Sequence, residues 1–510
     1  MDAFTLNRRR LLGGALGAAL VGCGGGGDSE AAPSDPVPGK NVDTALARLD
    51  GLTTDLMTRL GVPGVAVAVV QGERTIYAKG FGVRDMRSAG HVDADTVFQL
   101  ASMSKSIGAT AVAHEVGARR VGWDQPMREL LPWFALSDPE ASRLLTVGDL
   151  YAHRSGLPEH AGDHLEDLGF TQREVLERLR HAPLDGFRKK YAYTNFGLTA
   201  AGIAVAGKAG LDWATLNERV LYQPLGMRRT SSRFEDFQRR ENRVVGHIMK
   251  DGHWQVGPVR MPDAQAPAAS VTSSVNDIAK WLSMLLGQGT HQGRRVVDAD
   301  ALAPAISPQI QKPGQPDNYY GFGFNVGHTP GKRPLLGHSG AFSLGTATAF
   351  NLLPTAGLGI VVLTNGYPVG LPEILCVQFV DLVETGELQR DVVDAISRIF
   401  ADLNKPQGEL VGKLPPASPN PPGPLSAYAG RYHNDFYGPL RIDQAGAGLQ
   451  LTLGAMTTPL SLQHWDGGVF IFRPEAEGAP PGTISQATFA GNQVTLELYD
   501  EPKGLGVFVR

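Results

Sequence analysis

The fold of this 510-residue chain is indicated by the stretch Val97-Phe98-Gln99-Leu100-Ala101-Ser102-Met103-Ser104-Lys105. It ends in the only Ser-x-x-Lys of the sequence, where an apolar run gives way to a small-residue segment, 106–116, that predicts a helix. Positions i and i+3 of a helix share a face, so the Lys105 amine can reach the Ser102 hydroxyl and take its proton. The pair is a candidate serine nucleophile with its own base, and it predicts acyl transfer.

Two further motifs follow in a fixed order. The first, Tyr193-Thr194-Asn195, precedes a segment, 198–206, that predicts a helix with the asparagine near its N-terminal end. A phenol there can pass protons between nucleophile and leaving group, and the amide can hold a substrate carbonyl and the lysine. The second, His338-Ser339-Gly340, comes before two strand-like runs, 345–353 and 358–364. A strand that ends in a glycine leaves backbone N–H groups free for an oxyanion hole. We expect a strand to end in this way at Gly340.

Ser-x-x-Lys, Tyr-x-Asn and His-x-Gly in this order resemble the motifs of the serine β-lactamase and penicillin-binding-protein superfamily. The most similar branch is the class C β-lactamase-like group of esterases, D-aminopeptidases and DD-peptidases. Three further segments are similar to family segments: 146–158 with its Ser-Gly-Leu turn, 224–227, and 268–286. The resemblance extends from about Ala45 to about Glu384. It implies an α+β fold in which an antiparallel sheet is flanked by helices and carries an inserted helical region.

Carried over residue by residue, the resemblance implies Ser102 as nucleophile, Lys105 as its base and Tyr193 as proton relay. Four other positions would bind the substrate: Asn195, His338, Gly340 and Ala341. The backbone N–H groups of Ser102 and Ala341 would form the oxyanion hole. The resemblance implies no cofactor.

One position departs from the family pattern, because His338 stands where the β-lactamases have the lysine of Lys-Thr-Gly. A lysine would be a permanent cation for a substrate carboxylate, whereas histidine is mostly neutral above its ordinary pKa of about 6.5. The sequence therefore favours a serine hydrolase acting on a short-chain ester, a D-amino-acid peptide or a cell-wall peptide. Two alternatives stay open: a β-lactamase proper, and a non-catalytic cell-wall or ligand-binding protein on the same fold.

Other copies of the short motifs test this assignment. Tyr432-His433-Asn434 also reads Tyr-x-Asn, but it lies after the His-x-Gly motif in a strand-rich tail, so we interpret it as structural. His160-Ala161-Gly162 precedes the tyrosine motif, and His291-Gln292-Gly293 lies in a glycine-rich polar turn. Neither follows an apolar strand.

A metal site is a competing interpretation of the region just before the tyrosine motif. It holds the densest group of histidine and acidic residues in the chain: His153, Glu159, His160, Asp163, His164, Glu166 and Asp167. His160 and His164 have helical spacing, but Gly162 breaks the helix that this spacing needs, and the chain has no His-Glu-x-x-His. We therefore expect no metal, and a polar loop near the mouth of the site.

The N-terminus predicts export from a bacterial cytoplasm. Residues 1–22 read as a signal peptide with a twin-arginine-like Arg8-Arg9-Arg10 and a short apolar stretch. They end in Leu20-Val21-Gly22-Cys23, which resembles a lipobox in which Cys23 is lipidated; an ordinary signal peptide or a weak membrane anchor is the alternative. Residues 23–43 read as a flexible tether. We expect a periplasmic lipoprotein that contacts the membrane only through Cys23.

Composition agrees with an exported hydrolase. The formal net charge of −4 does not indicate a nucleic-acid partner, so a small molecule or a peptide is the expected substrate. The only other cysteine, Cys376, lies in an apolar helix-like segment, where a buried thiol is expected.

The length predicts two domains. We place the catalytic domain at 44–386, with strands at 64–71, 74–83 and 321–327 besides the two named above. A helix and a proline-rich linker follow at 387–424. Residues 425–510 alternate short apolar runs with turns, which predicts a small antiparallel β-barrel or sandwich similar to the lipocalin-like tails of some relatives. Such a tail could cap the cleft or drive self-association.

Overall fold

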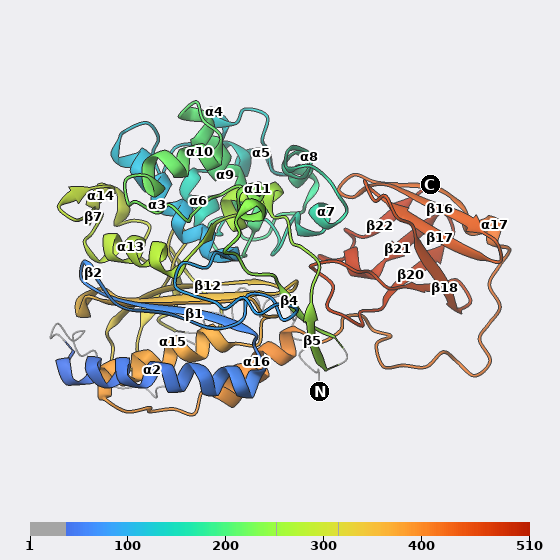
Figure 1. Ribbon diagram of the computed structural model, residues 1–510. Helices are drawn as coiled ribbons and strands as arrows, with labels where there is room; N and C mark the ends of the chain where they lie inside the picture. The colour runs from blue at the N-terminus through green and yellow to red at the C-terminus, as the bar shows by residue number, and fades with distance from the viewer. Residues whose placement is uncertain (1–36, 251, 315) are drawn as a thin grey trace.

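The structure, a computed structural model, describes residues 37–510 except 251 and 315, and its larger part has three layers (Figure 1). An antiparallel sheet lies between two helical layers, in the strand order β2-β1-β14-β13-β12-β11-β10-β9. This confirms the predicted α+β class. The strands are β1 (Gly64–Gln71), β2 (Arg74–Gly82), β9 (Ile310–Gln311), β10 (Tyr319–Tyr320), β11 (Asn325–His328), β12 (Pro334–Phe342), β13 (Thr346–Leu353) and β14 (Leu358–Thr364).

The two ends of the larger part meet near one edge of this sheet, as its second and third strands. Strand β1 pairs with β2 on one side and with β14 on the other, in a register that places Val65 opposite Thr364. All of β14 is buried, as is β1 up to its last residue, because helices cover both faces of the sheet. Strands buried on both faces read as continuous apolar runs, which is why these two were recognisable in the sequence.

One face of the sheet is covered by α2 (Gly39–Leu60), α15 (Leu371–Thr385) and α16 (Val393–Leu403). Helix α2 begins five residues before the predicted end of the tether, so the tether prediction was wrong for 39–43. Asn41 explains the difference, since its side chain is buried and donates to the carbonyl of Val383 on α15. The buried Cys376 lies in the core of this layer.

The other face carries the inserted helical region, which is drawn above the sheet in Figure 1. Short strand pairs lie outside this sheet: β3 (Phe98–Gln99) with β6 (Thr272–Ser273), β4 (His247–Lys250) with β5 (His253–Val256), and β7 (Thr290–His291) with β8 (Arg294–Arg295). The helices of the inserted region are α3 (Ser104–Gly117), α4 (Met127–Leu130), α5 (Pro139–Leu144), α6 (Val147–Tyr151), α7 (Asp163–Asp167), α8 (Gln172–Arg178), α9 (Asn195–Lys208), α10 (Trp213–Asn217), α11 (Phe234–Arg239), α12 (Ala266–Ala269), α13 (Val275–Leu286) and α14 (Ala299–Leu302).

The predicted strand at 321–327 is shorter in the structure, where β11 begins only at Asn325. Gly323 has a φ of +80°, and a Cβ there would lie 2.6 Å from the backbone oxygen of Lys105. The segment therefore turns to pack against α3 instead of extending the sheet.

The C-terminal part is a closed eight-stranded antiparallel barrel. Of the two predicted forms, the barrel is therefore confirmed and the sandwich is not. It follows the short helix α17 (Leu425–Tyr428), and the pairing of His433 with Val509 closes it. Strand β21 (Gln493–Leu496) ends at Leu496, where a 3-10 turn begins. The strands are β15 (Gly430–Asn434), β16 (Gly438–Ala445), β17 (Gly448–Leu453), β18 (Leu460–Asp466), β19 (Val469–Phe472), β20 (Ser485–Ala490), β21 (Gln493–Leu496) and β22 (Val507–Val509).

The barrel packs beside α7 and α8 of the inserted region (Figure 1). Arg178 donates to the carbonyls of Asp435 and Phe436, each at 3.2 Å, and Phe170 lies against Gly454. These contacts place the barrel next to the segment 160–167 that the sequence flagged as a polar loop.

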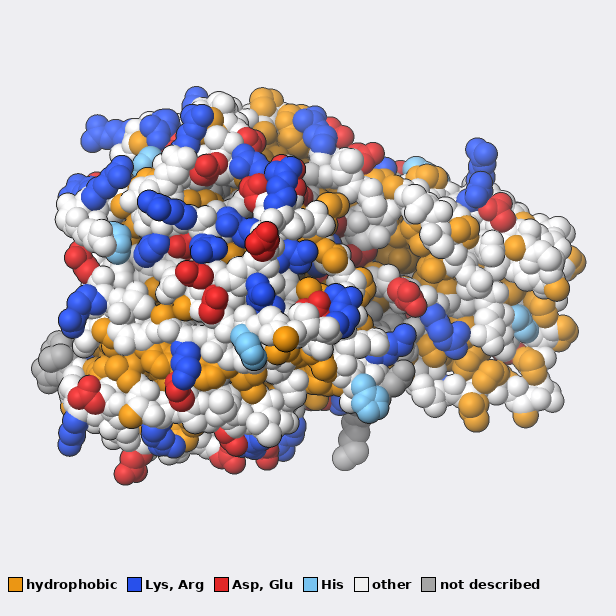
Figure 2. Space-filling model, viewed as in Figure 1, with side chains coloured by type: hydrophobic (Ala, Val, Ile, Leu, Met, Phe, Trp, Pro, Cys, Tyr) orange, Lys and Arg blue, Asp and Glu red, His pale blue; other side chains and the backbone are white. Residues whose placement is uncertain are grey.

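The surface mixes charges of both signs. Figure 2 shows Lys and Arg side chains interspersed with Asp and Glu over the visible face of the larger part. Among the helices of the described ranges, 37–250, 252–314 and 316–510, none combines the length and the apolar composition needed to cross a bilayer.

Candidate active site

Ser102 lies in a single 3-10 turn, η1 (Ala101–Met103), between β3 and α3. The residue before it, Ala101, has a φ of +47°, a left-handed conformation that is strained for a side chain larger than glycine. Backbone strain of this kind is concentrated at functional sites, where the surroundings hold it in place. Here the preceding Leu100 is fixed on both sides, because its N–H donates to Val271 and its carbonyl accepts from Thr348.

The amine of Lys105 is fully buried and lies near three oxygens. Its Nζ is 2.9 Å from Ser102 Oγ, 2.7 Å from Asn195 Oδ1 and 3.1 Å from the carbonyl oxygen of Ala268. The last two are carbonyl oxygens and can only accept. In the neutral amine, both N–H groups therefore bond to them, and the lone pair points at the Ser102 hydroxyl. This is the arrangement that a general base for Ser102 requires.

The protonation state of Lys105 fits the same role. Burial lowers the pKa of its amine to about 7, and the carboxylate of Asp163 acts in the opposite direction. A large share of the amine is thus neutral near pH 7, whereas an exposed lysine would be almost fully charged.

Tyr193 lies on the other side of the nucleophile. Its hydroxyl donates to Ser102 Oγ at 2.8 Å, and its ring lies 4.6 Å from the Lys105 amine. Burial raises the pKa of Tyr193, so the phenol keeps its proton at neutral pH. Ser102 can therefore accept from Tyr193 while it donates to Lys105, and the proton that Tyr193 holds is available for a leaving group.

A histidine that the sequence offered as a metal ligand holds the tyrosine motif. The His153 ring is buried 4.5 Å from the Tyr193 ring, and its Nδ1 accepts from the backbone N–H of Thr194 at 3.1 Å. Burial lowers the pKa of His153 well below its ordinary value, so the ring is neutral. Its contacts make it a packing partner of the motif.

Strand β12 lines the site along its open edge. The prediction that a strand ends at Gly340 was wrong, because β12 continues to Phe342. The edge is open for a different reason: the neighbouring β11 pairs with β12 only as far as Gly337, so the residues after it face Ser102 instead of another strand. Ala341 and Ser339 line the same cavity as Ser102, and the roles of the Ser102 and Ala341 N–H groups in an oxyanion hole stay a prediction.

Gly340 allows η1 to approach this edge. A Cβ at this position would lie 2.2 Å from the Leu100 oxygen and 2.8 Å from the Ser102 nitrogen. We expect Gly340→Ala to push the nucleophile out of register and to lower kcat/KM about a hundredfold, the scale of an ångström-size misplacement. The matched control is Gly207→Ala in α9, where a Cβ meets nothing within 4 Å. Wild-type kcat/KM in Gly340→Ala would show that the close contact has no catalytic role.

His338 is buried and neutral. Its Nδ1 lies 2.6 Å from the carbonyl of Ser339, which can only accept, so Nδ1 carries the proton and Nε2 accepts from the Tyr320 hydroxyl at 2.9 Å. Burial lowers the pKa of His338 to about 3, with further lowering by the charge of Lys105. His338 is therefore neutral over a wider pH range than the ordinary pKa of histidine implies. The side chain can offer shape and polarity to a substrate, but no charge.

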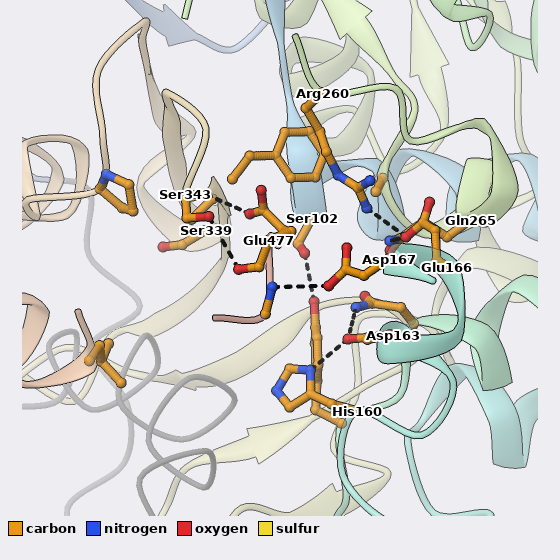
Figure 3. Close-up of a pocket in the computed structure, with 18 of the residues that line it drawn as sticks. Ser102, His160, Asp163, Glu166, Asp167, Arg260, Gln265, Ser339, Ser343 and Glu477 are labelled. Carbon is orange, nitrogen blue, oxygen red and sulfur yellow. Dashed lines mark hydrogen bonds and ion pairs between the residues drawn. The ribbon is translucent and has the colours of Figure 1, made fainter. Parts of the chain in front are cut away.

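Ser102 opens into a cavity of about 210 Å³, which Tyr193, Asn195 and His338 also line. The close-up in Figure 3 shows that this cavity includes charged residues from outside the three motifs. Sequence reasoning placed the loop with Asp163, Glu166 and Asp167 near the mouth of the site, but it did not find Arg260 and Glu477, which line the same cavity. The three acidic residues of this loop belong to the group first weighed as metal ligands, and here they contact protein donors instead.

The barrel supplies part of the cavity wall. The loop 473–484, between β19 and β20, carries Glu477, whose carboxylate accepts from the backbone N–H of Ser343 just beyond β12. The next residue, Gly478, donates its N–H to Asp167 at 3.1 Å (Figure 3). The C-terminal domain thus contacts both the segment just after β12 and α7.

The wall that this loop completes is acidic. Arg260 pairs with Glu166 and also acts on Asp167 and Glu477, whereas Asp163 lies beside His160, so the cavity residues include more carboxyl groups than arginines. Burial raises the pKa of Asp167 to about 7 and also raises that of Glu477. Asp167 is mostly ionised only above a pH of about 7, and its charge there disfavours a carboxylate in the cavity relative to a neutral or cationic group.

The other motif copies lie elsewhere or act differently. The hydroxyl of Tyr432 donates to the carbonyl of Tyr428 inside the barrel, and His291 lies in the β7–β8 hairpin. His160, in contrast, lines the cavity, and its Nδ1 donates to Asp163 at 2.9 Å. His160 could not be recognised as a site residue from the sequence, because a His-x-Gly motif before the tyrosine motif did not fit the expected order.

Two families match the chain. The family described as "Beta-lactamase" matches residues 49–375, and a domain of unknown function, DUF3471, matches residues 414–500.

Curated relatives cover both parts or the larger part alone. The chain is 27% identical over 491 residues to "Unguisins hydrolase ungD" of Aspergillus violaceofuscus, which covers 88% of this chain and 85% of the relative. It is 29% identical to "Penicillin-binding protein 4" of Amycolatopsis lactamdurans, over 61% and 83% of the two chains. A shorter match, 30% identical over 36% of this chain and 50% of the relative, is "Esterase EstB" of Burkholderia gladioli.

Solved structures share the fold. An octameric penicillin-binding protein homologue from Pyrococcus abyssi superposes with a TM-score of 0.61 at 19% identity, over 91% of this chain and 99% of that one. A class C β-lactamase from Rhodobacter sphaeroides gives a TM-score of 0.54 at 21% identity, over 66% and 98%.

Proposed function

Because this chain belongs to the β-lactamase family of serine hydrolases, we propose that it cleaves an ester or amide bond through an acyl-enzyme at Ser102. The observation that carries this proposal is the bonding of Lys105, whose two carbonyl partners leave the lone pair of a neutral amine to the Ser102 hydroxyl.

The proposed reaction has two halves. Lys105 takes the proton of Ser102 while Oγ attacks the substrate carbonyl, and backbone N–H groups beside Ser102 and Ala341 stabilise the oxyanion. The Tyr193 phenol gives its proton to the leaving group as the tetrahedral intermediate collapses, and the proton that Lys105 took from Ser102 then replaces it. In the second half, water takes the place of Ser102 as the attacking group and Ser102 becomes the leaving group. The same side chains then release the acyl group.

The substrate we favour carries no carboxylate near the scissile bond. Two features of the cavity support this: His338 is neutral, and the carboxyl groups of Asp167 and Glu477 line the same space as Ser102. The names of the relatives, a hydrolase of unguisins, a penicillin-binding protein and an esterase, support a peptide or an ester. A β-lactamase proper is the second candidate, favoured by the family match itself.

A parallel assay of short-chain esters, D-amino-acid peptides and nitrocefin on the purified protein separates these candidates. We expect turnover of esters or peptides to exceed that of nitrocefin, whose carboxylate would meet the acidic wall. Nitrocefin as the best substrate would favour the β-lactamase. A protein that neither turns over any of them nor reacts with a fluorophosphonate probe would be a non-catalytic binder.

The acidic wall gives a specific prediction for Glu477→Gln. Removing one charge about 10 Å from a substrate carboxylate, at an effective dielectric of about 20, is worth roughly 1.5 kcal/mol. We expect the ratio of kcat/KM for a carboxylate-bearing ester to that for its neutral analogue to rise up to about tenfold at pH 8. The matched control is Glu475→Gln, which removes an exposed charge from the same loop. An equal ratio in both variants would show that Glu477 does not select substrates by their charge.

We also propose a periplasmic location with a lipid anchor at Cys23. The support is the signal-like segment that ends in Leu20-Val21-Gly22-Cys23, which lies outside the described residues. Self-association through the barrel is a further proposal.

A further inference from the structure

The carboxylate of Asp163 lies directly behind the asparagine of the tyrosine motif. Its Oδ2 accepts from Asn195 Nδ2 at 2.8 Å and from His160 Nδ1 at 2.9 Å (Figure 3). An ionised carboxylate can only accept, so each of these two side chains must present an N–H to it.

This contact decides which way the Asn195 amide faces. With Nδ2 on Asp163, the amide oxygen Oδ1 faces Lys105 at 2.7 Å. In the flipped amide, the NH₂ group would face the lysine and donate to its lone pair. Lys105 could then no longer accept from Ser102, and Asp163 would be left with a carbonyl oxygen as neighbour.

The loop that carries Asp163 is held against the tyrosine motif. The N–H of His160 donates to the carbonyl of Tyr193 at 2.7 Å. Gly162 has a φ of +97°, and a Cβ there would lie 2.9 Å from Val175 and 3.0 Å from Phe196. Only glycine fits a backbone so close to α8 and α9 in this conformation, so Asp163 is placed by packing as well as by hydrogen bonds.

Asp163 also provides the charge that acts on the base. The other titratable side chains facing Lys105 are Tyr193, His153 and His338. Burial raises the pKa of the first and lowers the pKa of the two histidines, so all three are uncharged at neutral pH. The Asp163 carboxylate opposes the burial of Lys105 and raises the pKa of its amine.

We infer that Asp163 is a positioning residue that holds the Asn195 amide with its oxygen toward Lys105 and thereby keeps the lone pair of the lysine on Ser102. This inference rests on the proposed function. It adds a residue outside the three motifs to the machinery, one that acts through Asn195 and Lys105.

The test compares Asp163→Asn with Asp163→Ala in the full chain, using the pH dependence of kcat/KM on a neutral ester. An asparagine can still accept from Asn195 through its own oxygen but lacks the charge, whereas alanine lacks both. Asp185→Asn is the control, since it removes an exposed carboxylate from a neighbouring loop. Thermal melts establish that each variant is folded.

We expect the plateau value of kcat/KM in Asp163→Asn to stay within about threefold of wild type. The rise of kcat/KM with pH should move to lower pH by about half a unit or more, because loss of the negative charge lowers the pKa of Lys105. Asp163→Ala should show the same shift and lose about tenfold to a hundredfold in plateau rate, since the amide is no longer oriented.

If Asp163→Ala keeps the wild-type plateau of kcat/KM and the wild-type midpoint of its rise with pH, the inference is overturned, but the proposed hydrolase function is not. A folded Asp163→Asn variant with an unmoved midpoint would overturn the inference as well. Failure of the proposed function has a different signature, because wild-type protein would then remain unlabelled at Ser102 by a fluorophosphonate.

Discussion

Ser102→Ala should abolish ester turnover and fluorophosphonate labelling, with kcat/KM falling at least about ten-thousandfold, because the hydroxyl is the attacking atom. The substitution removes one oxygen at the cavity surface, and alanine is compatible with the turn that begins α3. Turnover is measured by ester hydrolysis, and folding by circular dichroism and thermal melting.

Ser88→Ala, which changes an exposed serine outside the cavity, controls for the loss of a hydroxyl as such. Probe labelling that persists in folded Ser102→Ala protein would place the nucleophile elsewhere. The residual rate of this variant also measures what the cavity achieves by binding alone.

Lys105→Ala should lower kcat/KM at least about a hundredfold, the scale for losing a proton-transfer group. In the wild type, kcat/KM should rise with pH and level off above a pKa of about 7, since only the neutral amine can take the serine proton. The variant should lose this limb. Rate against pH from about 5 to 9 on a neutral ester measures both effects, and neutrality of the ester keeps the titration of Asp167 from altering substrate binding.

Lys208→Ala, at the exposed end of α9, is the matched control and should retain the wild-type profile. A limb near pH 7 that survives in Lys105→Ala would assign the titration to another group. Asp167 would then be the first candidate, because burial raises its pKa to about 7 as well.

The fold and the three motifs could be predicted because their signals are local. Strands such as β1 and β14 are continuous apolar runs, and Ser102 and Lys105 are only three residues apart. The order of the motifs along the chain then indicated the family, and the family match confirms it.

The substrate-facing wall could not be predicted in the same way. Asp163 and Glu477 are brought together with Ser102 by two separate packing events, the seating of the 158–163 loop on Tyr193 and the docking of the barrel on α7 and α8. Neither loop has a repeated pattern, so its partners appear only when the chain is folded.

The charge of His338 illustrates a second limit. A sequence gives the residue type, and hence an ordinary pKa, but the shift to about 3 depends on complete burial behind Tyr320 and on the nearby Lys105. The same holds for the open edge of β12, which begins where the pairing with β11 stops at Gly337 and does not depend on Gly340.

The most direct test of the central claim is intact-protein mass spectrometry of the enzyme quenched in acid during turnover of a slow ester, followed by peptide mapping. The account predicts a mass gain equal to the acyl group, located on Ser102, which accumulates above pH 7 and is absent in Ser102→Ala and strongly reduced in Lys105→Ala. Steady hydrolysis without an adduct in any of these samples, or with the acyl group on another residue, would contradict it.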